Sequence, residues 1–510
     1  MTSTFYVTTP IYYVNDVPHI GHAYTTVAAD VLARYRRLRG FQVHFLTGTD
    51  EHGQKMQRAA EAQGITPLEM ADRNSASFRE LWAKMDISYD DFIRTTEPRH
   101  EQGVAALFRR LAEAGDIYLG QYEDWYCVPD ETYYTELQLK DGKCPMCRRP
   151  VEKVKEESYF FRMSKYQDRL LRHLQDHPEF LQPESRRNEI ISFVASGLRD
   201  LSISRISFAW GIPAPDNPRH VIYVWLDALA NYITALGYPD PKAEPFQTFW
   251  PSAVHLIGKD ILRHHAVYWP CFLMSAGLPL PKAIFAHGWW THEGEKMSKS
   301  LGNFVDPHDV IDRYGLDPFR YFLLREVPFG LDGDFSEAAL RQRINSDLAN
   351  DLGNLLSRTA GMVFKYRDGI VPASGPIEPL DRELRELAEE TLTKVDQAFS
   401  LFAFNRALEL TWALINKTNK YVDSSAPWSL AKDPAKKERL GTVLYSIAES
   451  LRLTALLIQP FMPDAANRMW EQLGIPEPLE RLDWKEAGRW GALPPGTRLR
   501  KGPALFPRLE

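Results

Sequence analysis

The sequence predicts an α/β fold built on a doubly wound parallel sheet, with a cysteine-containing insert and a C-terminal all-α helical bundle. Three observations support this prediction. Apolar strands alternate with helical patterns between residues 5 and 288, which is typical of a parallel sheet. Three of the four cysteines lie within residues 127–147, in a stretch that interrupts the alternation. From residue 347 onward, apolar residues recur at three- and four-residue intervals, as they do in packed helices.

Composition and charge are those of an ordinary globular protein. With 510 residues, 44% hydrophobic and 25% charged, the chain is long enough for more than one domain. The net charge of −6 excludes a general basic coat, so any RNA contact would use local patches. Four cysteines, three of them clustered, favour a reducing compartment and a metal clip over disulfides. We find no membrane-spanning apolar run and no signal peptide, so we expect a cytoplasmic protein with no membrane partner.

The first element is a strand–helix–strand unit. The β-branched and aromatic residues 5–8 predict a buried strand. In residues 21–39, apolar residues recur at helical spacing while four arginines fall on the other side, which predicts a helix that Gly40 ends. Residues 42–47 predict the second strand. The unit is therefore a βαβ crossover, which is almost always right-handed.

Two histidines stand at the turn that opens this helix. His19 and His22 are three residues apart, so on a first helical turn they project to the same side. The helix start offers unpaired backbone N–H groups, and Gly21 removes a side chain that would block the approach of a nucleotide. This arrangement predicts that the pair surrounds a phosphate or an adenine. Two surface histidines at a helix start are the alternative.

A cationic segment lies far downstream. Residues 296–300 read Lys-Met-Ser-Lys-Ser, so Lys296 and Lys299 flank a hydroxyl. This composition predicts a flexible loop that closes on a triphosphate as negative charge moves onto the leaving pyrophosphate. A solvated surface loop is the alternative for such a run taken alone. Together with the histidine turn, it favours one nucleotide site that both segments share.

The insert, residues 116–218, contains a predicted metal site. Cys144 and Cys147 form a knuckle whose thiolates point to a common centre, and Cys127 supplies a third sulfur. Asp130 stands where a fourth ligand is expected, and three sulfurs with one carboxylate oxygen make a permissible zinc tetrahedron. A structural zinc site is the prediction. The alternatives are that water is the fourth ligand or that the metal is lost.

After the insert, the chain returns to the sheet. Residues 220–226, 254–257 and 284–288 are predicted strands, with helices between them. Ligands of such sheets lie beyond the carboxyl ends of the strands. The residues expected at those ends are Ile11, Asp50, Trp225 and Lys259.

The C-terminal part changes character. Residues 289–345 are expected to be rich in loops and to end in a helix. The predicted long helices of the bundle cover residues 349–366, 381–399, 403–422 and 440–457. Residues 491–510 form a proline-rich, irregular tail.

The histidine turn and the lysine loop, in this order, resemble the two signatures of the class I aminoacyl-tRNA synthetases. Four further segments are similar to methionyl-tRNA synthetases, and the resemblance runs from Phe5 to Arg508. These segments are residues 9–15 (Thr-Pro-Ile-Tyr-Tyr-Val-Asn), 47–53 (Thr-Gly-Thr-Asp-Glu-His-Gly), 223–228 (Tyr-Val-Trp-Leu-Asp-Ala) and 257–261 (Ile-Gly-Lys-Asp-Ile).

The resemblance implies a reaction and a domain plan. The expected enzyme activates L-methionine with ATP and transfers the methionyl group to the 3′ end of initiator and elongator tRNA(Met). Because some relatives continue into a dimerising domain that this chain lacks, we expect a monomer. The expected parts are a Rossmann-like catalytic domain in two halves (1–115 and 219–288), the zinc-knuckle insert (116–218), a loop and stem-contact segment (289–345), an anticodon-binding bundle (346–490) and a tail (491–510).

The resemblance also implies roles for individual residues. Apolar and aromatic side chains select an unbranched thioether, and a carboxylate pairs with its ammonium. The methionine-binding positions are Ile11, Tyr13, Asp50, Trp225, Ala228, Tyr232 and His265. The ATP-binding positions are His19, Gly21, His22, Gly258, Asp260 and Lys299, and those that assist catalysis are His19, His22, Lys296 and Lys299, with Mg²⁺ on the pyrophosphate. For Trp225 and Tyr232, core aromatics at helical spacing are the alternative.

One position departs from the pattern of the family. The residue before His265 is His264, where relatives often have phenylalanine, so we expect a more polar and pH-sensitive pocket wall. In the bundle, the positions that match the anticodon contacts are Asn354, Arg358 and Trp428. Helix capping by Asn354 and a core role for Trp428 are the alternatives.

Three other functions compete with this interpretation. A class I synthetase for leucine, isoleucine or valine would carry a larger editing insert, and one for cysteine would place zinc in the amino-acid pocket. Another nucleotidyltransferase would not need a bundle of this length. A tRNA-binding paralogue without activity is disfavoured because the histidines, the lysines and Asp50 are all present.

Overall fold

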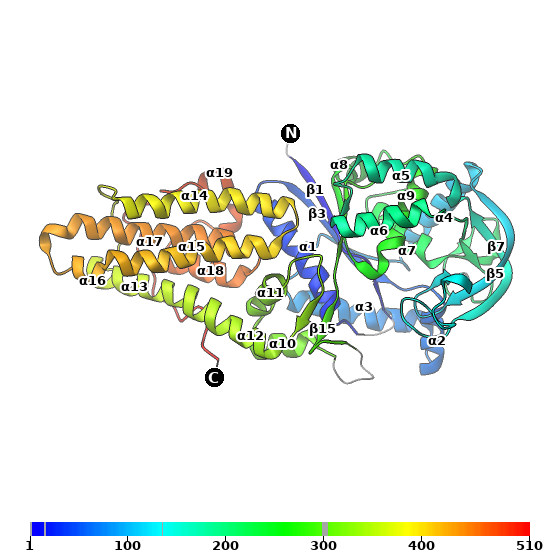
Figure 1. Cartoon of the computed structure of the whole chain (residues 1–510), viewed down its shortest axis with the longest axis horizontal. Helices are drawn as coiled ribbons and strands as arrows, with labels where there is room; N and C mark the ends of the chain where they lie inside the picture. The colour runs from blue at the N-terminus through cyan, green and yellow to red at the C-terminus, as the bar shows by residue number, and fades with distance from the viewer. Residues whose placement is uncertain (1–2, 15–16, 135, 298–303, 510) are drawn as a thin grey trace. The chain divides into compact units, whose positions relative to one another are not determined.

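The computed structural model describes residues 3–14, 17–134, 136–297 and 304–509. It divides into two compact units, which are described separately. The sheet unit comprises Thr4–Ala29 and Val43–Gly288, and the helical unit comprises Met1–Ser3, Asp30–Gln42 and Trp289–Glu510 (Figure 1). Helix α1 (Ile20–Leu38) begins in the sheet unit, and its C-terminal half is counted with the helical unit.

A parallel sheet forms the centre of the sheet unit, as predicted. Among the described residues it has seven strands, in the order β2-β3-β1-β13-β14-β8, with β4 paired to β3. The strands are β1 (Thr4–Thr8), β2 (Tyr12–Tyr13), β3 (Gln42–Asp50), β4 (Asp91–Arg94), β8 (Leu181–Gln182), β13 (Ala253–Gly258) and β14 (Ala283–His287). The pairs β1–β13, β13–β14, β14–β8, β2–β3 and β3–β4 are all parallel.

The predicted strand–helix–strand unit is present as β1, α1 and β3. Tyr6 and Val7 are fully buried in β1, and Val27 and Val31 are fully buried on α1. Gly40 then adopts a φ of 80°, which an L side chain rarely tolerates, so the chain turns there into β3. The apolar periodicity of the sequence therefore matches the buried faces.

The predicted sheet strand at residues 220–226 is wrong. The strand β12 (Asn217–Ile222) instead lies between β10 (Ser204–Arg205) and β11 (Pro213–Ala214) in a separate antiparallel sheet. Only two residues join β11 to β12, and Asp216 there has a φ of 66°. So short a turn makes a hairpin, which is necessarily antiparallel.

One more boundary differs from the one expected, and one strand was not expected. Helix α7 (Val224–Thr234) begins two residues after β12, so Trp225 lies in a first helical turn and not at the end of a parallel strand. Strand β14 also pairs in parallel with β8, a strand from within the insert that the sequence analysis did not predict. The short β8 lacks the long apolar run that would have predicted it.

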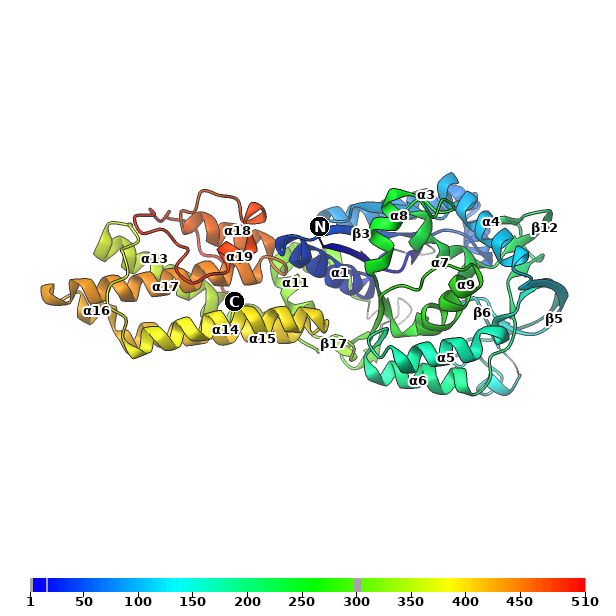
Figure 2. The ribbon, with the colours of Figure 1, turned by 90° about the horizontal axis from the view of Figure 1, so that it is seen from above.

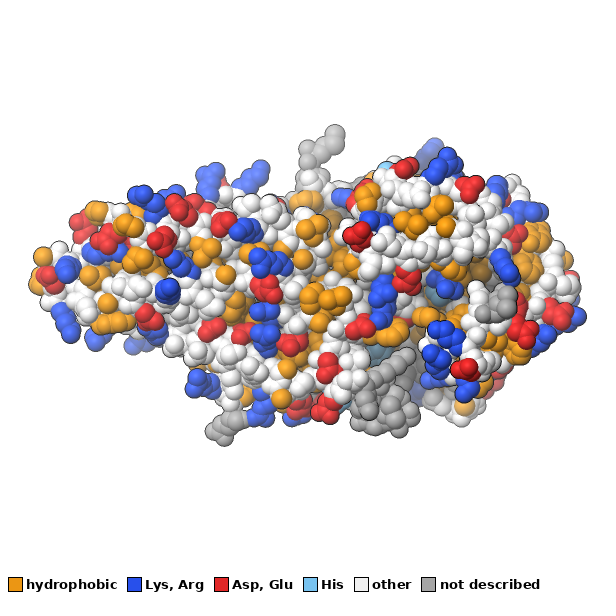
Figure 3. Space-filling view, in the orientation of Figure 1, with side chains coloured by type: hydrophobic (Ala, Val, Ile, Leu, Met, Phe, Trp, Pro, Cys, Tyr) orange, Lys and Arg blue, Asp and Glu red, His pale blue; other side chains and the backbone are white. Residues whose placement is uncertain are grey.

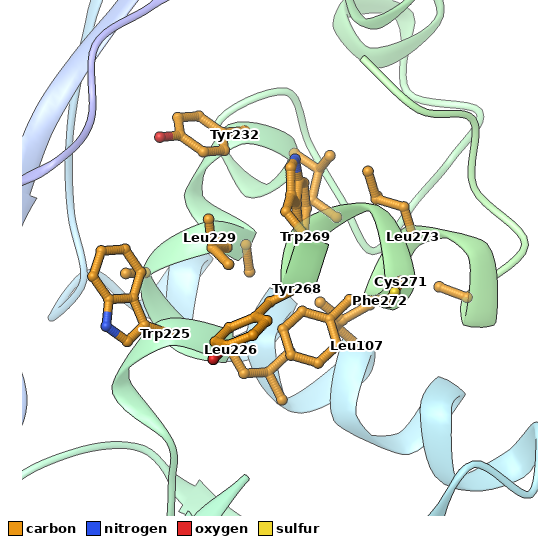
Figure 4. Packing of buried hydrophobic residues seen from close by; sticks show 14 of the residues in the cluster. Leu107, Trp225, Leu226, Leu229, Tyr232, Tyr268, Trp269, Cys271, Phe272 and Leu273 are labelled. Carbon is orange, nitrogen blue, oxygen red and sulfur yellow. The ribbon is translucent and has the colours of Figure 1, made fainter. Parts of the chain in front are cut away.

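Helices surround the sheet and enclose its core. They are α2 (Gln54–Gln63), α3 (Pro67–Lys84), α4 (Pro98–Glu113), α7, α8 (Glu244–Phe249) and α9 (Trp269–Ser275). Helix α3 begins with a capping box between Thr66 and Glu69, which pairs donors that a helix start otherwise leaves unpaired. Figure 4 shows part of the core, where Leu229 from α7, Leu107 from α4 and Phe272 from α9 belong to one apolar cluster. Cys271 is fully buried there.

The insert adds an antiparallel sheet and two helices. Strand β5 (Ile117–Cys127) pairs with β6 (Thr132–Tyr134) and β7 (Glu152–Phe161), and β7 also pairs with β9 (Leu201–Ser202). The cysteine knuckle, residues 127–150, begins at the last residue of β5 and includes β6. Helices α5 (Gln167–Asp176) and α6 (Glu184–Ala195) complete the insert.

The helical unit contains the predicted bundle. Its long helices are α13 (Asn354–Arg367), α14 (Pro379–Ser400), α15 (Phe404–Ser425) and α17 (Lys437–Ile458), with α16 (Pro427–Leu430) and α18 (Pro463–Gln472) beside them. Helices α14, α15 and α17 lie side by side (Figure 2). On the face seen in Figure 3, acidic and basic side chains are interspersed over this unit, in keeping with the net charge of −6.

Two expectations for this unit are corrected. Residues 289–345 are more regular than predicted, because they contain α10 (Pro307–Tyr314), α11 (Leu316–Arg325) and α12 (Glu337–Arg343) and the strands β15 (Trp290–His292), β16 (Glu295–Lys296) and β17 (Gly333–Phe335). Among the described residues, Pro434–Ile458 is long and apolar enough to cross a membrane by length and composition, contrary to our expectation. All of its apolar window is buried in the unit, where it forms a core helix.

Candidate functional site

The two histidines of the helix start are held as neutral donors. The backbone N–H of Gly21 donates to Nδ1 of His19 at 3.0 Å, and the backbone N–H of His19 donates to Nδ1 of His22 at 3.2 Å. An Nδ1 atom that accepts carries no proton, so in both rings the proton is on Nε2. The rings stack with centroids 3.8 Å apart, and burial lowers the pKa of His22 well below its ordinary value. The pair therefore presents two uncharged N–H donors.

The structure shows a second reason for a glycine at position 21, beside the one expected. A Cβ built on Gly21 would lie 2.9 Å from Cε1 of His19, so the glycine makes room for the folded His19 ring. His287, which the sequence analysis did not single out, ends β14 and lies against α1. Its Nδ1 donates to the carbonyl of Gly288 at 2.7 Å, so its Nε2 accepts from the hydroxyl of Thr25, also at 2.7 Å. The signal in the sequence that could have identified His287 is its position at the end of a predicted buried strand.

The predicted methionine-binding residues of apolar and aromatic type meet in one place. Ile11, Trp225, Ala228 and Tyr232 belong to a single cluster of buried residues, and Tyr13 packs against it. Trp225 and Tyr232 lie about two turns apart on α7, and both are labelled in Figure 4. Both side chains are buried, as they would be in a pocket wall and equally in a hydrophobic core.

The orientation of His265 is set by two hydrogen bonds. The ring lies in a π-helical segment, His264–Tyr268, and is almost completely buried. Its Nδ1 donates to the carbonyl of Ile261 at 3.0 Å, so its Nε2 accepts from the hydroxyl of Tyr232 at 2.7 Å. Burial lowers the pKa of His265 to about 4. The wall is therefore neutral at physiological pH.

His264 stacks on Trp225, with ring centroids 3.8 Å apart and an angle of 13° between the planes. Its Nε2 lies 3.5 Å from the hydroxyl of Thr132. Burial, together with the charges of His265 and Arg263, lowers the pKa of His264 well below its ordinary value. We expected a pH-sensitive wall, but a ring that stays neutral does not titrate near pH 7.

Asp50, the last residue of β3, is a buried carboxyl group that forms no ion pair within 4.0 Å among the described residues. Its Oδ1 atom has no hydrogen-bond partner among the described residues, and the residue is 2% exposed. Burial and the neighbouring carboxylates, Asp227 first among them, raise the pKa of Asp50 well above its ordinary value. A substrate ammonium beside this carboxylate would restore its charged form.

A buried network that no local pattern predicts connects three elements behind this site. The two carboxylate oxygens of Asp227, on α7, lie 2.7 Å from Nδ1 of His52 and 2.7 Å from Nε2 of His100. His52 follows Asp50 by two residues, and His100 lies on α4. Burial opposes ionisation of Asp227, but the two imidazoles outweigh it and lower its pKa. The network fixes α7 relative to the end of β3.

The remaining ATP-binding predictions lie at the end of β13. Gly258 is its last residue, and a Cβ there would collide with Oδ1 of Asp260. Asp260 is exposed in the short turn Lys259–Ile261 that follows. Both residues thus occupy the carboxyl end of a parallel strand, which is where such sheets bind ligands.

The lysine segment belongs to the helical unit. Lys296 lies on strand β16, which pairs with β15 in a hairpin, and not in a loop as expected. The turn between these strands, Glu293 and Gly294, has positive φ at both residues, as a tight hairpin requires. Lys299 lies outside the described residues.

The four predicted metal ligands converge. The ligand atoms of Cys127, Asp130, Cys144 and Cys147 all lie within 4.8 Å of one another. The sulfurs of Cys127 and Cys147 are 3.5 Å apart, and the Cys127 sulfur is 3.6 Å from Oδ2 of Asp130. Zinc bonds of about 2.3 Å to sulfur and about 2.1 Å to oxygen give tetrahedral edges of about 3.6–3.8 Å. The donor set therefore fits a zinc ion.

The predicted anticodon residues lie on the bundle. Asn354 and Arg358 occupy the first turns of α13, and Arg358 is paired with Asp423 at 2.8 Å. Trp428, in α16, is 42% exposed. This exposure excludes a core role for Trp428 and leaves its ring available for stacking.

Comparisons with known proteins bear on the whole chain. The family described as "tRNA synthetases class I (M)" matches residues 5–153 and 149–360. The family described as "Anticodon binding domain of methionyl tRNA ligase" matches residues 371–510.

Individual relatives are similar over the same extent. A methionine–tRNA ligase of Caldanaerobacter subterraneus subsp. tengcongensis is 56% identical over 100% of this chain and 80% of its own length. That of Bacillus subtilis is 54% identical over 100% of this chain and 78% of its own. The structure of Mycobacterium tuberculosis methionyl-tRNA synthetase in complex with methionyl-adenylate superposes with a TM-score of 0.96 at 48% identity, covering 99% of this chain and 100% of that one.

Proposed function

The chain belongs to the methionyl-tRNA synthetases of class I, and we propose a role for each of its site residues in the reaction. It is a methionine–tRNA ligase, which activates methionine with ATP and transfers it to tRNA(Met). The roles proposed below rest on the placement of the residues in each unit.

Substrate selection is the first role. The ammonium of methionine pairs with Asp50, and the thioether lies against Trp225 and Tyr232. The observation that carries this assignment is the buried Asp50 carboxylate with its unpaired Oδ1 atom. Ile11, Tyr13, Ala228 and His265 complete the wall. A neutral His265 suits an uncharged side chain, because it neither attracts nor repels charge.

Adenylation is the second role. An oxygen of the methionine carboxylate attacks the α-phosphorus of ATP, and the bond from that phosphorus to the bridging oxygen of pyrophosphate breaks. The Nε2–H groups of His19 and His22 donate to the phosphates without acting as nucleophiles. Gly258 and Asp260 hold the ribose and adenine, and Gly21 allows the histidine turn.

Stabilisation of the negative charge on the departing pyrophosphate is the third role. Lys296 and Lys299 donate to its oxygens as their charge grows, which lowers the barrier more than it strengthens ground-state binding. Mg²⁺, when bound, neutralises charge on the same oxygens. In the transfer step, the 2′-hydroxyl of the terminal ribose of tRNA attacks the adenylate carbonyl, and AMP leaves.

The helical unit and the knuckle have supporting roles. Asn354 and Arg358 read base edges of the anticodon, and Trp428 stacks on an unpaired base. A structural zinc ion held by Cys127, Asp130, Cys144 and Cys147 stabilises the knuckle. The cytoplasmic location and the monomeric state stay predictions.

ATP–pyrophosphate exchange with each amino acid in turn tests the assignment. We expect exchange with methionine and background exchange with leucine, isoleucine, valine and cysteine. Charging of tRNA(Met) transcripts, initiator and elongator, then tests the transfer step. Exchange that depends on leucine or cysteine instead of methionine would contradict the proposal.

A further inference from the structure

Glu131 directly follows the predicted metal ligand Asp130, yet its carboxylate contacts Tyr13 and Lys55 and is not part of the metal cluster. It is 1% exposed, although it lies in the cysteine knuckle. Its φ of 47° is in the left-handed region, which residues other than glycine rarely adopt. Such a conformation persists where surrounding contacts hold it.

The carboxylate of Glu131 reaches the wall of the methionine pocket. The hydroxyl of Tyr13 donates to Oε2 at 3.4 Å, and the backbone N–H of Lys55 donates to Oε1 at 3.3 Å. The ammonium of Lys55 lies 5.2 Å from the centre of the Tyr13 ring and donates to the carbonyl of Pro129 at 3.4 Å. Tyr13 is therefore held between Glu131 and Lys55.

The backbone of Glu131 reaches the opposite wall. Its carbonyl accepts from the hydroxyl of Tyr223 at 2.8 Å, and Tyr223 immediately precedes α7, which carries Trp225 and Tyr232. Room for the Glu131 side chain depends on Gly53, because a Cβ there would lie 2.7 Å from Oε1. One residue of the knuckle thus contacts strand β2, the start of α2 and the start of α7.

The next residue, Thr132, also connects the knuckle to the proposed pocket. The hydroxyl of Thr132 donates to the carbonyl of Asp130 at 2.8 Å and lies 3.5 Å from Nε2 of His264. His264 in turn stacks on Trp225. Glu131 and Thr132, the two residues after Asp130, therefore both contact residues that line the proposed pocket or that pack against its lining.

We propose that Glu131 is a positioning residue for methionine, which couples the cysteine knuckle to the pocket by holding Tyr13 and Tyr223. Glu131 acts through these two tyrosines and is not assigned a contact with the substrate. The inference rests on the methionine pocket proposed above. It predicts that changes at Glu131 alter the binding of methionine while ATP binding and the chemical step are retained.

The test compares Glu131→Gln and Glu131→Ala with the wild-type enzyme in ATP–pyrophosphate exchange. We expect KM for methionine to rise about tenfold in Glu131→Ala, which removes both carboxylate oxygens but keeps the carbonyl that accepts from Tyr223. The rise should be smaller in Glu131→Gln, which keeps one side-chain oxygen. KM for ATP and kcat should change little. Glu136→Gln, an exposed position in the same knuckle, is the matched control and should behave as wild type.

A double-mutant cycle with Tyr13→Phe tests the route. If Glu131 acts through the Tyr13 hydroxyl, the effects of Glu131→Gln and Tyr13→Phe on KM for methionine are not additive. Melting temperature and zinc content of each variant report whether the knuckle is folded. Full additivity, or an equal rise in both KM values with a lower melting temperature in Glu131→Gln, would overturn the proposal.

The result also separates this inference from the proposed function. If the wild-type enzyme shows no methionine-dependent exchange, both are wrong. If it does and both Glu131 variants match the wild type in KM for methionine, only the positioning role is wrong.

Discussion

Tyr232 donates its hydroxyl proton to Nε2 of His265 at 2.7 Å, and the direction of this bond is fixed by the carbonyl of Ile261 on the other side of the ring. A carbonyl only accepts, so Nδ1 of His265 carries the proton and Nε2 must accept. The bond therefore fixes one tautomer of His265, a residue of the proposed methionine pocket. Its partners come from α7 and from the π-helical segment after β13.

Replacing Tyr232 by phenylalanine should leave Nε2 of His265 buried without a donor. An unsatisfied buried acceptor costs about 1–3 kcal/mol, so we expect a corresponding loss in the free energy of unfolding. KM for methionine should rise because the wall loses its fixed orientation. Thermal unfolding and exchange kinetics measure the two effects. Tyr89→Phe, a half-buried tyrosine elsewhere in the sheet unit, is the control, and equal losses in both variants would contradict the argument.

Stability should fall as the pH drops below the ordinary pKa of histidine. Burial lowers the pKa of His265 to about 4, whereas in the unfolded chain it is about 6.5. Between these values the unfolded state binds a proton that the folded state excludes, so the contribution is complete above about pH 6.5 and is lost toward pH 4. The slope is about 1.4 kcal/mol per pH unit for one such histidine.

Unfolding curves of the wild type and of His265→Asn between pH 4 and 7 measure this slope. In the variant, the free energy of unfolding should depend less steeply on pH, because the contribution of one histidine is absent. An identical dependence in both proteins would show that His265 titrates normally in the folded state.

If the four proposed ligands hold zinc, folding of the knuckle should depend on the metal. Loss of an outer partner of a metal site costs about 10–100-fold in affinity, so loss of the Asp130 ligand should cost more than about 100-fold. Zinc content after dialysis against a chelator should fall in Asp130→Ala and be kept in Asp130→Cys, which restores a fourth donor. Equal retention in Asp130→Ala and the wild type would remove Asp130 from the ligand set.

Lys299→Ala should slow methionine activation far more than it weakens methionine binding. Loss of a donor that acts in the transition state lowers kcat by about 10²–10³-fold, and KM for methionine should change little. Exchange kinetics give both numbers. Equal losses in kcat and in methionine binding would take the lysine out of the transition-state role.

Trp428→Ala should weaken tRNA charging and leave exchange intact. Stacking of a base on an aromatic ring contributes about 1–3 kcal/mol, so KM for tRNA(Met) should rise about 10–100-fold. Exchange without tRNA is the internal control, because it does not involve the anticodon. An unchanged KM for tRNA would mean that the exposed indole does not contact the anticodon.

Elements with a strong local period could be predicted from the sequence. The unit β1–α1–β3 and the long helices α14, α15 and α17 combine clear apolar periodicity with clear ends. The convergence of Cys127, Asp130, Cys144 and Cys147 could also be predicted, because all four lie within a stretch of 21 residues. These features depend on neighbours in the chain.

What depends on distant partners could not be predicted in this way. Residues 220–222 look like any buried strand, and only their pairing with Pro213 and Arg205 places them outside the parallel sheet. His52 and His100 are 175 and 127 residues from Asp227, so no window of sequence contains the network. Likewise, the neutral state of His264 follows from burial by the whole fold and not from its neighbours.

The backbone bonds to His19 and His22 have a consequence for how the enzyme responds to salt. Uncharged imidazoles bind a phosphate through short-range hydrogen bonds, which dissolved ions screen little. An exposed ammonium instead attracts a phosphate over a longer distance, and this distance becomes shorter as the ionic strength rises. If the histidines and lysines have the roles proposed above, added salt should change the KM for ATP little and should mainly reduce the contribution of the lysines to the departure of pyrophosphate.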